Sequence, residues 1–228
     1  MKRIYLFLIM GFLALSCGNN QEKENSDQVQ KTEEAPVLTN PEAVEPVFPD
    51  DAEAERTDWQ NPETVLQALG NLNSKTVADI GAGAGYFSFK LARLAQKVIA
   101  LDIDPNALEY INEQKEIVGN WADNIETRLT PPDVPNLLPD EADAVLVVNT
   151  FYFIPQQQLY FERLKEGMKP DAELVIVDFK KGEIPVGPSD DRKMDVSEVK
   201  SILRKAGYRK ISIDEKSLEY QYIIKAVN

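Results

Sequence analysis

The chain has 228 residues, of which 43% are hydrophobic and 8% aromatic, enough for a globular core of one domain or two small ones. It contains no histidine, which excludes Ser/His/Asp and Cys/His catalytic sites and histidine metal sites. The formal net charge of −13 argues against nucleic acid as the main partner, because phosphates would be repelled.

The first 17 residues have the composition of a targeting segment. Lys2 and Arg3 precede the apolar run 4–15, which is too short to span a bilayer but has the length of a signal-peptide core. The single cysteine, Cys17, follows directly, and this arrangement resembles a bacterial lipoprotein signal, although Ala14 stands where leucine is usual. The resemblance implies lipidation of Cys17 and export to the cell envelope, anchored at the periplasmic face or the cell surface. An ordinary secretory signal or a short uncleaved anchor is the alternative.

Residues 18–56 are predicted to form a disordered acidic tether. They are rich in glutamate and proline and show neither the helical nor the strand period of apolar residues. Such a segment cannot bury enough surface to offset its loss of conformational entropy on ordering. One domain, residues 57–228, is expected to follow.

Strand and helix patterns alternate along the domain. Strands are expected at 76–80, 97–103, 125–129, 143–149, 173–178, 210–214 and 221–226, and helices at 62–69, 84–95, 105–117, 155–168 and 197–206, the last with Ser197 as N-cap. Apolar strands alternating with amphipathic helices predict a doubly wound α/β fold, with a seven-stranded, mostly parallel sheet. The last two strands are too close for a parallel crossover, so the last strand should be antiparallel.

The chemically informative residues surround the first expected strand and the turn that follows it. Asp79 ends that strand, and a glycine-rich turn then leads into a helix whose N-terminus offers unpaired N–H groups. Asp102 ends the second expected strand, where an acid is placed to accept hydrogen bonds from ribose hydroxyls. Together the turn and the acid predict an adenosine ligand at the carboxyl edge of the sheet.

The spacing of the glycines distinguishes two ligand classes. A dinucleotide fingerprint, G-x-G-x-x-G, would place its third glycine where this chain has Tyr86. The chain instead has G-x-G-x-G, with Asp79 before it, and that carboxylate would repel a pyrophosphate but attract a cationic amino group. The pattern resembles motif I of the class I S-adenosylmethionine-dependent methyltransferases, and a nicotinamide-dependent oxidoreductase is the disfavoured alternative.

The resemblance continues through most of the domain. Asp102-Ile103-Asp104-Pro105 resembles the second motif of this family, Asp133 follows the third strand, where the family contacts adenine, and Asn149 belongs to its fourth-strand motif. The segment 164–170 resembles another family motif, and 59–62 and 187–192 resemble segments of exported methyltransferases. The resemblance implies S-adenosylmethionine as the cofactor, with contacts from Asp79, Gly81, Ala82, Gly83, Gly85, Tyr86, Asp102, Ile103, Asp133 and Asn149.

A catalytic base is harder to predict. Methyl transfer needs one only when the acceptor must lose a proton, and the candidates are Tyr152, Asp178 and Asp191. Related sequences tend to carry histidines after the fourth strand and near position 191, which this chain lacks. No metal-ligand spacing stands out. We expect the methyl acceptor to be a small molecule or an envelope component, and the alternative is a catalytically silent binding protein that kept the nucleoside pocket.

Overall fold

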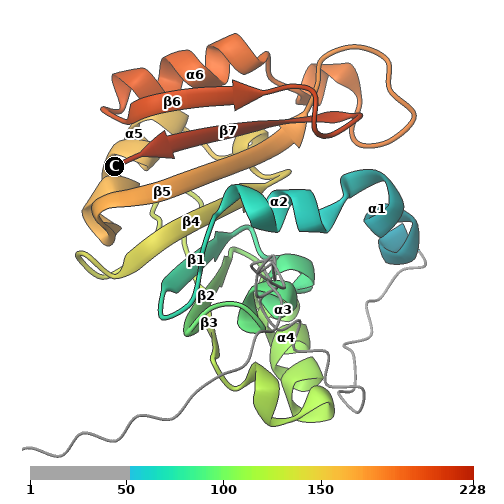
Figure 1. Cartoon of the computed structure of the whole chain (residues 1–228), viewed down its shortest axis with the longest axis vertical. Helices are drawn as coiled ribbons and strands as arrows, with labels where there is room; N and C mark the ends of the chain where they lie inside the picture. Colours follow the sequence, from blue (N-terminus) through green and yellow to red (C-terminus); the bar gives the residue numbers. More distant parts are fainter. Residues whose placement is uncertain (1–51) are drawn as a thin grey trace, which may run out of the picture. The chain divides into compact units, whose positions relative to one another are not determined.

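A computed structural model describes residues 52–228 of the chain (Figure 1). The predicted signal peptide, the lipidation site Cys17 and nearly all of the predicted tether lie outside these residues. Among residues 52–228, no helix combines the length and the hydropathy that crossing a bilayer requires.

A seven-stranded sheet with the strand order β3-β2-β1-β4-β5-β7-β6 forms the centre of the domain. The strands β1 to β5 are parallel, and β7 is antiparallel to both β5 and β6. This arrangement confirms the predicted fold class. The strands are β1 (Thr76–Ile80), β2 (Lys97–Asp102), β3 (Ile125–Leu129), β4 (Ala142–Val148), β5 (Met168–Phe179), β6 (Arg209–Asp214) and β7 (Gln221–Val227).

Helices cover both faces of the sheet (Figure 1). Buried side chains of α2, α3 and α4 join one hydrophobic cluster, and those of α5 and α6 join a second cluster on the other face. The helices are α1 (Ala52–Gln60), α2 (Pro62–Ala68), α3 (Tyr86–Ala92), α4 (Pro105–Val118), α5 (Gln157–Gly167) and α6 (Val196–Lys205), with short 3₁₀ helices η1 (Asn120–Ala122), η2 (Phe151–Phe153) and η3 (Asp190–Arg192).

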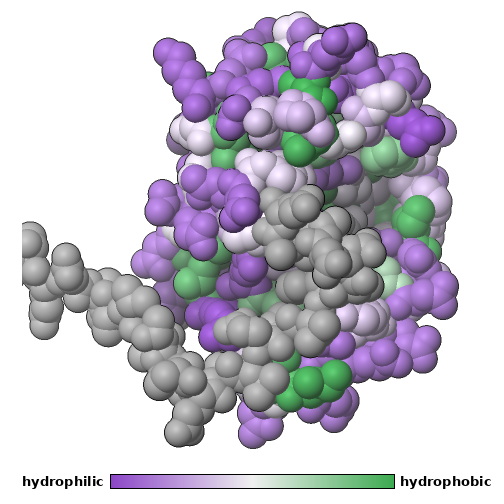
Figure 2. Space-filling model, turned by 90° about the vertical axis from the view of Figure 1, so that its right-hand side faces the viewer, coloured by the Kyte–Doolittle hydropathy of each residue, from purple (hydrophilic) through white to green (hydrophobic). Residues whose placement is uncertain are grey.

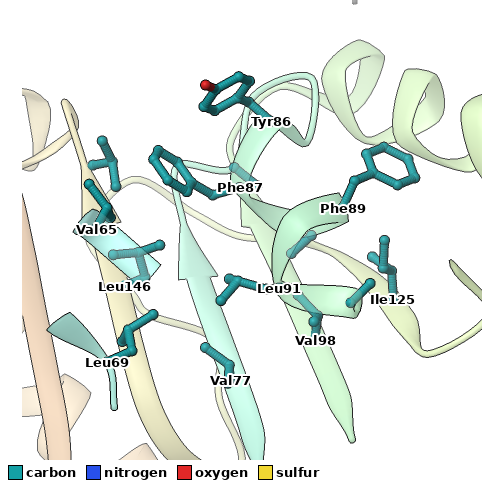
Figure 3. Packing of buried hydrophobic residues seen from close by; sticks show 14 of the residues in the cluster. Val65, Leu69, Val77, Tyr86, Phe87, Phe89, Leu91, Val98, Ile125 and Leu146 are labelled. Atoms are coloured by element: carbon teal, nitrogen blue, oxygen red, sulfur yellow. The ribbon is translucent and has the colours of Figure 1, made fainter. Parts of the chain in front are cut away.

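The apolar strand sequences explain the two clusters. Successive strand residues point to opposite faces, so Val77 belongs to the first cluster and its neighbour Ala78 to the second. Figure 3 shows Val65 of α2 and Leu69, the C-cap of that helix, beside Leu146 of β4 in the first cluster. Full burial of each such side chain stabilises the fold by roughly 1.5–3 kcal/mol.

The first helix was not predicted. The helix α1 begins at Ala52, within the segment assigned to the tether, so the ordered domain starts before residue 57. Its sequence is mostly charged and polar, so it shows no apolar periodicity that would predict a helix. Its position depends on contacts with α3 that are described below.

Several helix boundaries also differ from prediction, and three of them have a clear local reason. The helix α3 begins at Tyr86 because Gly85 adopts a left-handed φ of 88°. The helix α5 ends at Gly167 because Met168 is extended and opens β5. The N-cap of α6 is Asp195 and not Ser197, since the Asp195 carboxylate accepts a hydrogen bond from the Ser197 N–H at 2.8 Å.

Candidate functional site

The glycine turn after β1 packs closely against its neighbours. The N–H groups of Gly81 and Ala82 both donate to the Leu101 carbonyl, at 2.9 and 3.1 Å. Gly81 has a φ of +73°, and a Cβ there would lie 2.3 Å from Thr150 Oγ1. Only glycine therefore lets this turn approach the loop that follows β4.

Gly85, the N-cap of α3, is closely packed. A Cβ at Gly85 would lie 2.9 Å from Ile111 Cγ1 and 3.0 Å from Phe89 Cε2, so this glycine allows α3 to pack against α4. It lines neither of the two cavities beside the turn. Packing therefore explains a glycine at this position, and its contact with the cofactor stays a prediction.

Asp102 joins the turn to the end of β2. One oxygen of its carboxylate accepts a hydrogen bond from Gly83 N–H at 2.7 Å, and the other accepts from Asp104 N–H at 2.9 Å. These bonds fix the carboxylate at the edge of the sheet. Each carboxylate oxygen has two acceptor lone pairs, so Asp102 keeps capacity for two hydroxyl donors.

A first cavity of about 200 Å³ opens beside Asp102, with mostly apolar walls. Its lining residues are Ile80, Gly81, Asp102, Ile103, Thr130, Pro131, Pro132, Thr150, Phe153, Ile154 and Tyr160. One carboxylate within flat apolar walls suits a planar base that is attached to a sugar. Asp102 and Ile103 lie where the sequence predicted.

Asp133, a predicted cofactor contact, does not line this cavity. Its carboxylate lies 3.3 Å from Arg163 NH1, and its backbone carbonyl accepts a hydrogen bond from the same guanidinium at 2.8 Å. The preceding residues Thr130, Pro131 and Pro132 line the cavity in its place.

A second cavity of about 210 Å³ lies on the other side of the glycine turn. It shares Gly81 and Thr150 with the first cavity, so the two are adjacent. Unlike the first, it contains a cation, Arg56, and an anion, Asp79. The other lining residues are Gly81, Ala82, Gly83, Ala84, Tyr86, Phe87, Val148, Asn149 and Thr150.

Asp79 is the buried anion of the second cavity. Ser88 Oγ donates a hydrogen bond to Asp79 Oδ2 at 2.7 Å. Burial raises the pKa of Asp79 to about 6, against the opposing effects of the Ser88 hydrogen bond and the nearby charge of Arg56. The pocket therefore holds a carboxyl group that titrates close to neutrality and that would gain from a cationic partner.

Arg56 comes from α1 and is not among the predicted site residues. Its guanidinium lies 4.3 Å from the centroid of the Tyr86 ring, and Tyr86 OH is 2.8 Å from Thr57 Oγ1. These contacts hold α1 against the start of α3. The Trp-Gln-x-Pro segment at 59–62 resembles a family motif, whereas Arg56 lies at the end of the predicted tether, where no motif marks it.

Asn149 directly follows β4 and lines the second cavity. Its φ is +57°, a left-handed conformation that asparagine tolerates better than most residues. Its N–H donates to the Val177 carbonyl at 2.9 Å, and its Oδ1 accepts a hydrogen bond from Gln221 Nε2 at 2.5 Å. Both backbone and side chain are thereby fixed.

The three candidates for a catalytic base lie outside both cavities. Asp178 is buried and accepts a hydrogen bond from Phe179 N–H at 2.8 Å, and the nearby backbone N–H groups of Phe151 and Tyr152 act to lower its pKa. Burial raises the pKa of Asp178 to about 6. The carboxylate of Asp178 thus lies beside the start of η2, and neither Tyr152 nor Asp191 lines a cavity.

The two cavities together match one kind of ligand. The first offers apolar walls and a ribose-binding carboxylate, and the second offers opposite charges for a group that is itself zwitterionic. The turn without side chains at Gly81 and Gly83 lies between Asp102 and Asp79. An adenosyl group joined to an amino acid fits this order, whereas a pyrophosphate would lie against the buried carboxylate of Asp79.

Comparison with known proteins agrees with this reading. Residues 72–224 match a family model described as a methyltransferase domain. A crystal structure of a SAM-dependent methyltransferase from Aquifex aeolicus is 29% identical, covers 76% of this chain and 92% of its own, and has a TM-score of 0.71. Phosphoethanolamine N-methyltransferase 2 of Haemonchus contortus, in complex with S-adenosyl-L-methionine, shares the fold at 14% identity, over 75% of this chain and 52% of its own, with a TM-score of 0.61.

Two kinds of curated relative are also similar. The tRNA U34 carboxymethyltransferase of Ruthia magnifica is 28% identical over 61% of this chain and 40% of its own length. The carboxy-S-adenosyl-L-methionine synthase of Histophilus somni is 23% identical over 82% of this chain and 79% of its own. The chain thus spans less than half of the first relative.

Proposed function

Because the chain belongs to the methyltransferase domain family and has S-adenosylmethionine as its cofactor, we propose that it methylates a small molecule or a component of the cell envelope. The observation that carries this proposal is the pair of adjacent cavities around the glycine turn. One contains Asp102, and the other contains Asp79 and Arg56. The adenosyl part would lie in the first cavity and the amino-acid part in the second.

The cofactor would supply the reactive methyl group, and the protein would bind and orient the reactants. The bound cofactor supplies a methyl group on a positively charged sulfur, which makes that carbon an electrophile. The residues of the chain bind and orient it, with Asp102 for the ribose hydroxyls, Asp79 for the ammonium and Arg56 for the carboxylate. Walls such as Ile103 and Phe153 exclude water from the adenosyl part. Holding two reactants in line in this way lowers the barrier by several kcal/mol.

The cavity walls favour acceptors that need no protein base. The carboxylates that line them are Asp79 and Asp102, and both are assigned to binding the cofactor. An amine or a thiol can present a lone pair after losing its proton to solvent, whereas an alkyl hydroxyl needs a base at the moment of transfer. We therefore propose an amine or a thiol as the acceptor group.

Charge and predicted location support an acceptor other than nucleic acid. The chain carries a net charge of −13, and the face shown in Figure 2 is mostly hydrophilic with small separate hydrophobic patches. We propose that Cys17 is lipidated and that the domain acts at the cell envelope. This location requires a supply of cofactor, which is made in the cytosol.

Release of S-adenosylhomocysteine from S-adenosylmethionine tests the proposed activity. The purified chain should release it when small thiols or amines are present, and much more slowly with alcohols. Asp104→Ala, which removes a helix cap outside both cavities, is the matched variant that should keep activity. Cofactor binding without release for any acceptor would favour the silent binder, and transfer to RNA alone would contradict the acceptor class.

Incorporation of radiolabelled palmitate in a bacterial host tests the proposed anchor. The wild-type chain should be labelled and recovered with membranes, and Cys17→Ser should be neither. Equal membrane recovery of the two chains would contradict lipidation at Cys17.

The raised pKa of Asp79 gives cofactor binding a predicted pH dependence. Below about pH 6 this carboxyl is protonated and loses its attraction for the α-ammonium group. Affinity for S-adenosylhomocysteine should therefore fall by up to about tenfold per pH unit below pH 6 and become constant above it. Isothermal titration at a series of pH values measures this, and 5′-methylthioadenosine, which has no amino-acid part, is the control ligand. Asp79→Asn should bind weakly at every pH, and an unchanged pH profile in that variant would refute the assignment.

A further inference from the structure

A series of hydrogen bonds between side chains connects Arg56 of α1 with Asn149 by way of Gln60 and Gln221. Arg56 Nε donates to Gln60 Oε1, and Gln60 Nε2 donates to Gln221 Oε1 at 3.2 Å. Gln221 Nε2 then donates to Asn149 Oδ1 at 2.5 Å. Arg56 and Asn149, the two ends of this hydrogen-bonded chain, both line the second cavity, whereas Gln60 and Gln221 do not.

The arginine sets the direction of every bond in this chain. A guanidinium has donors and no acceptor, so Gln60 must turn its carbonyl toward Arg56 and its NH₂ toward Gln221. Gln221 must then turn its own NH₂ toward Asn149. The remaining atom, Asn149 Nδ2, keeps its two N–H donors, and no residue of the described part of the chain accepts a hydrogen bond from it.

Burial makes this direction costly to reverse. Gln60 is 0% and Gln221 1% exposed, so water cannot replace a missing partner. Both the carbonyl and the NH₂ of each glutamine are used within the chain. Reversing one amide would place two donors or two acceptors face to face, which buried polar groups avoid.

We propose that Gln60 and Gln221 are positioning residues that orient the Asn149 amide, so that the second cavity presents N–H donors to the carboxylate of the cofactor's amino-acid end. The proposal rests on the cofactor site described above. Arg56 and Asn149 then supply donors for the carboxylate, and Asp79 supplies the acceptor for the ammonium. The second cavity would thus distinguish the two ends of a zwitterion, and Gln60 and Gln221, which do not line it, would maintain that preference.

Gln60→Glu tests the proposal at a residue outside the cavity. The introduced carboxylate still accepts from Arg56 but cannot donate to Gln221, so Gln221 must reverse and Asn149 with it. Asn149 Oδ1 would then face the cofactor carboxylate. We expect the Kd of S-adenosylhomocysteine to rise about tenfold, with that of 5′-methylthioadenosine unchanged within about twofold. Gln221→Glu breaks the next bond in the chain, should give the same pattern, and replaces Gln60→Glu if that variant does not fold.

Asn149→Gly distinguishes an effect transmitted through the hydrogen-bonded chain Gln60–Gln221–Asn149 from a simple effect of the added charge. Glycine suits the left-handed backbone of position 149 and removes the amide. If Gln60→Glu acts through Asn149, it should have no further effect on S-adenosylhomocysteine in the Asn149→Gly background. If Gln60→Glu raised the Kd of S-adenosylhomocysteine just as much in that background, or weakened the binding of both ligands equally, the proposed role of Gln60 and Gln221 would be overturned. A wild-type chain that binds neither ligand would instead overturn the cofactor site itself.

Discussion

Asp102→Ala is expected to weaken binding of S-adenosylhomocysteine by about a hundredfold or more, because two hydrogen bonds from ribose hydroxyls to a charged acceptor are lost. The same change releases the N–H groups of Gly83 and Asp104, which the carboxylate now fixes at 2.7 and 2.9 Å. The glycine turn should therefore lose part of its preorganisation as well. Isothermal titration at constant pH and salt measures the effect.

Two variants make the result specific. Asp102→Asn keeps the shape and one acceptor oxygen, so its affinity should lie between those of the wild type and Asp102→Ala. Asp104→Ala removes the carboxylate that caps α4 through Asn106 N–H at 2.9 Å but lines neither cavity. It should cost about 1 kcal/mol of stability and leave affinity unchanged. Equal affinities for the wild type and Asp102→Ala would contradict the role of this carboxylate.

Gly81→Ala is expected to lower the free energy of unfolding by about 2–5 kcal/mol and to abolish measurable cofactor binding. The added Cβ would meet Thr150 Oγ1 at 2.3 Å and Thr150 Cγ2 at 2.5 Å, and the φ of +73° is unfavourable for alanine. Because both cavities share Gly81 and Thr150, the displacement would change both at once. Urea unfolding and isothermal titration measure the two effects.

Gly119→Ala is the matched control for backbone strain. Gly119 has a φ of +81°, but a Cβ there would have no heavy atom within 4 Å, and it lines neither cavity. Its φ of 81° and ψ of −167° lie in a region that is nearly confined to glycine, so Gly119→Ala should cost about 1–3 kcal/mol through backbone strain alone and leave cofactor affinity unchanged. If Gly81→Ala and Gly119→Ala behaved alike, the close approach to Thr150 would not be what requires glycine at position 81.

Most of the fold was predictable because the sheet depends on local pattern. Runs such as 144–148 are apolar throughout, and burial on both faces of a parallel sheet requires that pattern. The turn from β1 to α3 was predictable because glycines and a strand-ending acid are close in sequence. The helix α1 was not, since its charged sequence acquires a position only through contacts of Arg56 and Thr57 with Tyr86.

Several predicted site residues have partners that are distant in sequence. Asp133 resembled a ligand residue, but Arg163, thirty residues later, pairs with it. Asp178 lies at the sheet edge as topology predicts, but nearby N–H groups from the loop after β4 act on its carboxylate to lower its pKa. The bond between Gln60 and Gln221 joins residues 161 positions apart, and no local pattern marks it.

Titration of the full chain with S-adenosylhomocysteine and, separately, with NAD most directly tests whether the paired cavities hold an adenosyl amino acid. Saturable binding of S-adenosylhomocysteine to one site, without binding of NAD, is the predicted result. Binding of NAD in preference to S-adenosylhomocysteine would contradict the assignment, because Asp79 would then lie against a pyrophosphate.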